Sequence, residues 1–172
     1  MSKSALTLWC LVCVLVSAPP ATAQDIAEKG MILMKEENLG GLKVDITAKE
    51  FVAILGKPEK TGKDVEWEAL GQWVQEYAWP KAGVTANMVS DKKGGSKTVL
   101  MFTAKAPWDK PTKKGIRIGS TEEETRKAYG ALEEKESSEK GKLLVVGSVY
   151  GGMQFHFTKG KVSEIFFGAS AE

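Results

Sequence analysis

The residues of this chain that could do chemistry are few and scattered. Cys10 and Cys13 form a CxxC pair, a spacing that serves metal binding or thiol–disulfide exchange when it lies in a folded, partly polar site. Both cysteines lie inside the apolar run from Ala5 to Val16, which offers no such site. Since these are the only two cysteines, we expect neither a disulfide nor a thiolate metal site in the rest of the chain.

His156 is the only histidine, and no partner for a catalytic or metal role stands at a useful spacing from it. The triplet Glu122-Glu123-Glu124 resembles an acid cluster, but acids in the first turn of a helix complement the helix dipole. The pairs Gly94-Gly95 and Gly151-Gly152 are read as turns, since no capped helix directly follows either. Because no nucleotide-binding or hydrolase motif is present, we expect no enzyme, no cofactor and no metal.

Aromatic side chains are the better candidates for a binding surface. Trp73, Tyr77 and Trp79 share one face of a predicted strand over 72–79, because alternate strand residues point the same way. They either pack beneath helices as core or line an open face as a contact platform, and the usual burial of large apolar groups slightly favours the core. Trp67 and Trp108 are expected in loops beside that face.

His156 alternates with Phe155 and Phe157 and is therefore expected on a polar, open face of its strand. The candidate binding residues are Trp73, Tyr77, Trp79, Tyr150 and His156.

The first 23 residues have the pattern of a signal peptide. Lys3 precedes an apolar run of about a dozen residues, shorter than the roughly 20 that span a membrane, and Ala21-Thr22-Ala23 suits signal peptidase. We expect cleavage after Ala23, a periplasmic or secreted product and no stable membrane insertion. An uncleaved anchor is the less favoured alternative.

Cleavage would leave 149 of the 172 residues and lower the net charge from +2 to +1, since Lys3 is the only charged side chain removed. The remaining acids and bases are interspersed, without the basic patch of a nucleic-acid-binding protein. The length suits a single domain that buries its own core.

The chain repeats itself at an offset of 74 residues. Residues 41–60 and 115–134 align without a gap, with identities at Gly41/Gly115, Thr47/Thr121, Glu50/Glu124 and Gly56/Gly130. Each copy predicts a helix that starts at a Thr-x-x-Glu capping box and stops at its glycine. The predicted inward residues are Phe51, Ile54 and Leu55 in the first helix and Ala128 and Tyr129 in the second.

Three predicted strands follow each of these helices. Turn signals separate runs at 72–79, 84–89 and 98–104 in the first unit, and at 143–150, 153–158 and 162–167 in the second. A further N-terminal helix is expected over 24–38, apolar at Ile26, Ala27, Met31 and Met34 and weakened by Gly30.

These elements predict an α+β fold of two tandem helix-plus-meander units in one antiparallel sheet, with the helices on one face. The expected divisions are the N-terminal helix and first repeat (24–104), a solvated linker (105–114) and the second repeat (115–172), all within one compact domain. The other face of the sheet would then be open for function.

The order of these motifs carries a resemblance to known families. An extended lead-in, a Thr/Glu helix, Gly56-Lys57-Pro58 and the hairpin from Gly152 to Ile165 resemble small envelope domains of the SmpA/BamE type, and their tandem form resembles the β-lactamase-inhibitor-protein (BLIP) fold. This signal lacks the lipidation motif of the first type, and the predicted mature chain lacks the disulfides of the second. The resemblance implies an exported, non-catalytic domain that binds proteins through a sheet face.

We therefore expect a non-enzymatic protein-binding module of the bacterial envelope, with its partner on the open sheet face. One alternative is a carrier of a small apolar ligand, suggested by the apolar residues Met31, Met34, Met88, Met101, Met153, Phe155 and Phe157. Another is an inhibitor of a secreted enzyme.

Overall fold

The computed structural model describes residues 23–169. The expected signal peptide lies outside this part of the chain, apart from Ala23, where the first helix begins. The described helices are α1 (Ala23–Glu36), α2 (Ala48–Leu55), α3 (Glu122–Tyr129) and the short 3-10 helix η1 (Gly130–Leu132). The strands are β1 (Lys60–Thr61), β2 (Val65–Trp67), β3 (Gln72–Trp79), β4 (Val84–Ser90), β5 (Thr98–Lys105), β6 (Leu143–Ser148), β7 (Gly151–Thr158) and β8 (Lys161–Gly168).

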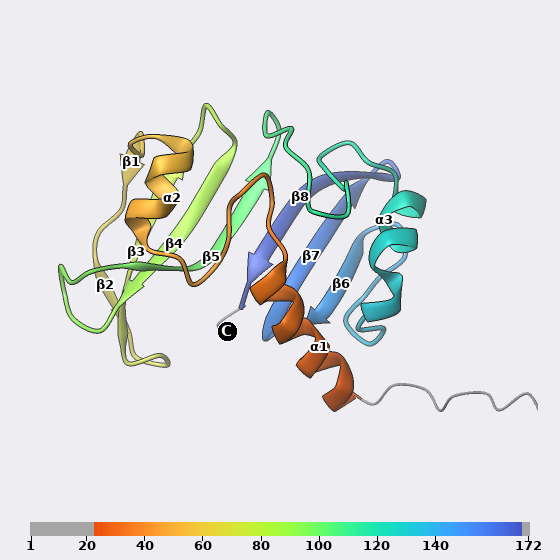
Figure 1. The fold of residues 1–172 in the computed structure, drawn as a ribbon, viewed down its shortest axis with the longest axis horizontal. Coiled ribbons are helices and arrows are strands. Elements are labelled where there is room, and N and C mark those ends of the chain that lie inside the picture. The colour runs from red at the N-terminus through yellow and green to blue at the C-terminus, as the bar shows by residue number, and fades with distance from the viewer. Residues whose placement is uncertain (1–22, 170–172) are drawn as a thin grey trace, which may run out of the picture.

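All eight strands belong to one antiparallel sheet, in the order β1-β3-β4-β5-β8-β7-β6, with β2 also paired to β3. The two meanders β3-β4-β5 and β6-β7-β8 meet where β5 pairs with β8, in the middle of the sheet (Figure 1). The predicted α+β class and single antiparallel sheet are confirmed. The short strands β1 and β2 were not predicted, and Trp67 ends β2 instead of lying in a loop.

One face of the sheet carries the core. Leu33 of α1, Phe51 of α2 and Tyr129 of α3 pack into a single apolar cluster with sheet residues such as Phe102 and Phe155. The Phe51 ring lies 5.5 Å from that of Phe102, and the Tyr129 ring lies 5.1 Å from that of Phe155. The three helices therefore attach to the same side of the sheet.

Both short helices start in the same way. Thr47 and Thr121 each form a complete capping box, in which their backbone N–H donates 2.8 Å to the Glu50 or Glu124 carboxylate. The residue just before each capping box also accepts a hydrogen bond from the strand of its meander that lies at the centre of the sheet, β5 or β8. Val99 N donates to Ile46 O at 2.9 Å, and Val162 N donates to Ser120 O at 2.8 Å.

The two helices end differently. Gly56 has φ of +80° and stops α2, whereas Gly130 has φ of −60° and lets the chain continue into η1. The predicted end of α3 at Gly130 is confirmed, but Gly130 keeps right-handed helical geometry and does not end the helix in the left-handed conformation that Gly56 adopts. Ile54 was also predicted to face inward, but it is 38% exposed.

Helix α1 occupies the predicted region, and Met34 packs against the core as predicted, but Met31 does not. Met31 is 58% exposed, whereas Gly30 and Leu33 are buried. An added Cβ on Gly30 would lie 2.7 Å from Gly147 Cα and 2.8 Å from Gly151 O. The glycine that weakens the helix as an isolated segment is what lets α1 approach β6 and β7 closely.

The connection between the two meanders packs onto the domain. Trp108 and Thr112 are 7% and 2% exposed, and Pro111 O accepts a 2.8 Å hydrogen bond from Gly40 N. The expectation of a solvated linker over 105–114 was therefore wrong for these residues, because the indole of Trp108 is part of the apolar core.

Candidate functional site

The sheet face opposite the helices presents a mixed apolar and polar surface. Its side chains alternate with the core residues Phe102, Phe155 and Phe167 along three neighbouring strands. We call the part of this surface over β5, β8, β7 and β6 the open-face patch; its half-buried side chains include Met101, Thr103, Leu143, Gln154, His156, Glu164 and Phe166.

The strand register brings this patch together. Phe166 of β8 lies opposite both Thr103 of β5 and Gln154 of β7. His156 lies next to it, between Glu164 and Leu143 of the neighbouring strands. Strand residues directly opposite one another on the same face have Cβ atoms about 5 Å apart, so these side chains form one continuous surface.

An ion pair lies within this surface, beside His156. Lys105 Nζ and Glu164 Oε2 form an ion pair at 2.7 Å across β5 and β8. Since both charges are partly exposed, the pair contributes at most about 1 kcal/mol to stability. Aromatic residues such as Phe166 are enriched in protein contact surfaces relative to the rest of a protein surface.

The prediction that His156 lies on the face away from the core is confirmed, since Phe155 and Phe157 on either side of it belong to the core. Within residues 23–169, no group of three His, Cys, Asp or Glu side chains could hold a metal ion.

The predicted aromatic set lies on the helix side of the sheet. Trp79 is 2% exposed, its indole Nε1 donates 2.9 Å to Gly56 O, and its ring lies 5.6 Å from that of Phe51. Tyr77 packs against Trp79 with ring centres 6.2 Å apart, and Trp73 on the same strand face lies beneath Lys93 Nζ at 5.1 Å. The core interpretation therefore holds at Trp79, whose side chain is buried beneath α2.

Tyr150 is placed differently again. β6 ends at Ser148, so Tyr150 lies in the turn before β7 and is 74% exposed. The structure thus places the five candidate residues on three different surfaces, and only His156 belongs to the open-face patch.

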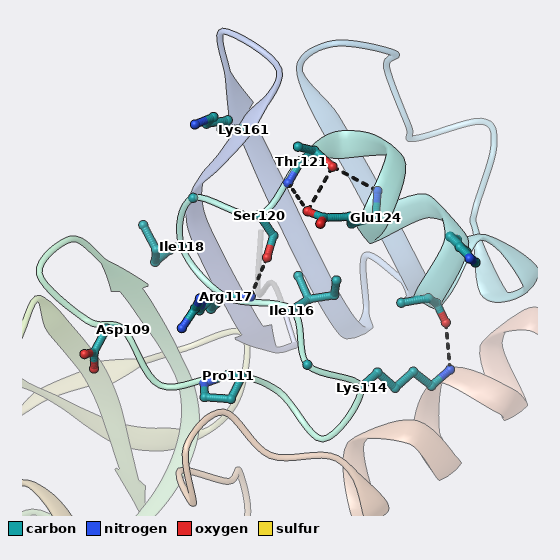
Figure 2. Close-up of a pocket in the computed structure, with 14 residues that line it drawn as sticks. Asp109, Pro111, Lys114, Ile116, Arg117, Ile118, Ser120, Thr121, Glu124 and Lys161 are labelled. Atoms are coloured by element: carbon teal, nitrogen blue, oxygen red, sulfur yellow. Dashed lines mark hydrogen bonds between the residues drawn. The ribbon is translucent and has the colours of Figure 1, made fainter.

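A second feature was missed by the sequence analysis: a cleft of about 1070 Å³ on the helix side of the sheet. It lies between the connection that precedes α3, α3 itself and the start of β8 (Figure 2). Ile116 and Ile118 contribute an apolar floor. The cationic side chains around it are Lys114, Arg117, Lys127 and Lys161. Because these four come from three separate segments, no local motif marks them.

We call this feature the basic cleft. Two carboxylates also line it. Asp109 is exposed at one end. The Glu124 carboxylate accepts hydrogen bonds from Thr121 N at 2.8 Å and Thr121 Oγ1 at 2.9 Å. These two bonds, of which the one from the backbone has the larger effect, hold the pKa of Glu124 below its usual range. The charges of Arg117 and Lys161 lower that pKa further.

Comparison of the chain with protein-family models, with curated proteins and with solved structures finds no match. None of the helices in the described part of the chain combines the length and the apolar character needed to cross a membrane.

Proposed function

We propose that this protein is an exported, non-enzymatic binding domain that holds a protein partner on its open-face patch. The observation that carries the proposal is the one-sided placement of the helices: Leu33, Phe51 and Tyr129 all pack on one face of the sheet. On the other face, Phe166 and His156 stay half-buried beside polar neighbours.

The borders of the sheet support a partner on the face and not on an edge. β1 and β2 lie along the outer edge of β3. At the opposite border, Glu134 N donates to Val145 O at 2.9 Å and Leu143 N donates to Glu139 O at 2.8 Å. These bonds use backbone groups through which an added strand would pair.

We further propose that the two halves are tandem copies of one helix-plus-meander unit. The support is the equivalent bonding of the two helix starts: Ala48 N donates to Lys97 O at 2.9 Å, and Glu122 N donates to Gly160 O at 3.0 Å. This arrangement agrees with the resemblance to SmpA/BamE-type and BLIP-type domains. That resemblance and the N-terminal signal pattern support a place in the bacterial periplasm or outside the cell.

Site-specific photo-crosslinking in the native envelope tests the partner surface. A photoreactive amino acid replaces either His156 or Thr103 on the open-face patch, and Ala53 on the exposed side of α2 serves as the control. We expect the two open-face positions to capture the same protein on irradiation and Ala53 not to capture it. Equal capture at all three positions, or none at the open-face positions, would contradict the proposed surface.

A substitution checks the same point. Phe166→Ser removes the central ring of the patch, while Tyr150→Ser removes an exposed ring from the β6–β7 turn. We expect Phe166→Ser to abolish the crosslink from His156 and Tyr150→Ser to leave it unchanged. Thermal unfolding of both variants establishes that a lost crosslink does not come from a lost fold.

A further inference from the structure

We propose that the basic cleft binds an extended acidic segment of a protein and so forms a second interaction surface, on the opposite side of the sheet from the open-face patch. The inference does not depend on the function proposed above, because the two surfaces share no residue. It rests on the charge of the cleft, on its floor and on its size.

The positive charge of the basic cleft is only partly compensated by its own carboxylates, Asp109 and Glu124. Lys97, Lys105 and Arg126 each form an ion pair at 2.7 Å elsewhere in the fold. Arg117 and Lys161 form no ion pair or side-chain hydrogen bond among the described residues, and both are exposed. Four cationic side chains and two carboxylates line the cleft, which leaves an excess of two positive charges that solvent ions or a partner can balance.

Lys127 and Lys114 extend this charge along α3. The Lys127 side chain is exposed and has no carboxylate partner within residues 23–169. Lys114 Nζ donates 3.0 Å to Ala128 O and lies 4.7 Å from the centre of the Tyr129 ring, which holds it against the cleft wall. Of the two acids present, Glu124 accepts hydrogen bonds from Thr121, which favour its ionised form, and together with Asp109 it offsets two of the four positive charges.

The floor and the size indicate what kind of anion fits. Ile116 is 5% exposed and belongs to the core, and Ile118 and Ala128 pack partly against it. The cleft volume of about 1070 Å³ equals that of the largest small-molecule pockets, which reach roughly 1,000 Å³. A small inorganic anion would leave the exposed parts of Ile118 and Ala128 uncovered. An extended peptide with acidic side chains toward the cations and apolar side chains toward Ile118 and Ala128 would cover both.

The test is selection of peptides on the purified full-length chain. A random peptide library displayed on phage is panned on the protein, and each recovered peptide is synthesised with a fluorophore for anisotropy titration. The test variant is Arg117→Glu/Lys161→Glu. The matched control is Lys49→Glu/Lys57→Glu, which makes the same charge change at two exposed lysines of the first unit.

We expect the recovered peptides to be rich in Asp and Glu with interspersed apolar residues. The Arg117→Glu/Lys161→Glu variant should bind them about tenfold or more weakly, since two attractive contacts become repulsive. The control variant should bind as the unchanged protein does.

Three results would overturn the proposal: no enrichment, enrichment of peptides without acidic residues, or equal weakening in both double variants. The last would mean that only net charge matters. A fourth overturning result is competition by inorganic phosphate at low millimolar concentration, which would assign the cleft to small anions. Circular dichroism of both variants shows whether they fold.

Discussion

Tyr129 Oη donates a 2.7 Å hydrogen bond to Glu37 Oε2 at the point where α1, α3 and the connection between the two meanders meet. Glu37 is 3% exposed, and its other oxygen accepts from Lys113 N at 2.7 Å and Asn38 N at 2.9 Å. One carboxylate thereby joins three segments that are far apart in the chain. Polar groups buried in this way stabilise a fold only when each of them has a partner.

Removal of the Tyr129 hydroxyl should therefore destabilise the protein. Tyr129→Phe leaves one oxygen of a buried carboxylate without its donor, which costs about 1–3 kcal/mol. Urea unfolding followed by tryptophan fluorescence measures the change. Tyr150→Phe is the control, because Tyr150 is 74% exposed, and its stability should change by no more than about 0.5 kcal/mol. Equal stabilities of the two variants would contradict the role of this hydrogen bond.

The same tyrosine predicts a loss of stability at high pH. Burial, assisted by the negative charge of Glu37, raises the pKa of Tyr129 well above its usual value. In the unfolded chain a tyrosine loses its proton near pH 10. Above that pH the folded protein holds a proton that the unfolded chain has released, so the free energy of unfolding falls as pH rises. Below about pH 9 Tyr129 holds its proton in both the folded and the unfolded protein, so its contribution to the free energy of unfolding is fully present and does not change with pH.

A comparison with Tyr129→Phe isolates the effect from the many lysines that titrate in the same range. The free energy of unfolding should decline more steeply above about pH 10 in the unchanged protein than in Tyr129→Phe. Ultraviolet absorbance supplies an independent measurement, because the phenolate signal of Tyr129 should appear only together with unfolding. Parallel pH profiles for the two proteins would refute this reading.

Two glycine substitutions should have opposite effects. Gly30→Ala would improve the intrinsic helix propensity of α1 by about 1 kcal/mol. Its methyl group, however, would meet Gly147 Cα at 2.7 Å and Gly151 O at 2.8 Å. Because these contacts are with backbone atoms, α1 would have to shift away from the sheet, and we expect a net destabilisation of about 1–3 kcal/mol.

Gly130→Ala provides the matched comparison. Gly130 has φ of −60° and nothing within 4 Å of an added Cβ, so alanine should stabilise the protein by about 0.4–1 kcal/mol through the unfolded state. Both variants are measured by denaturant unfolding. Stabilisation by Gly30→Ala would show that α1 does not pack against β6 as described.

The two assignments of aromatic residues can be separated by truncation. Trp79→Ala should cost about 3–5 kcal/mol, because it empties a fully packed site beside Phe51 and frees Gly56 O from its indole donor. Tyr150→Ala should change stability by less than about 1 kcal/mol. Differential scanning calorimetry compares the two. Comparable melting temperatures would return Trp79 to the list of surface candidates.

Much of the local structure follows from the sequence alone. The Thr47 and Thr121 capping boxes form as their spacing predicts, since the hydrogen bonds involved span only three residues. Strand β3 has the predicted limits, because turn residues bound a run of aromatic and β-branched side chains. The alternation that places His156 away from the core likewise depends only on the two-residue period of a strand.

Tertiary structure decided which of these surfaces are free. Gly30 lowers the helix propensity of α1 as an isolated segment, yet its lack of a side chain lets α1 pack closely against Gly147. The sequence alone allows the aromatic face of β3 to be either a contact surface or part of the core. The packing of Phe51 of α2 against Trp79 decides for the core at Trp79. The basic cleft combines Arg117 with Lys161 from distant segments. Burial and charge proximity depend on contacts between residues far apart in the chain, and the pattern of one segment does not contain them.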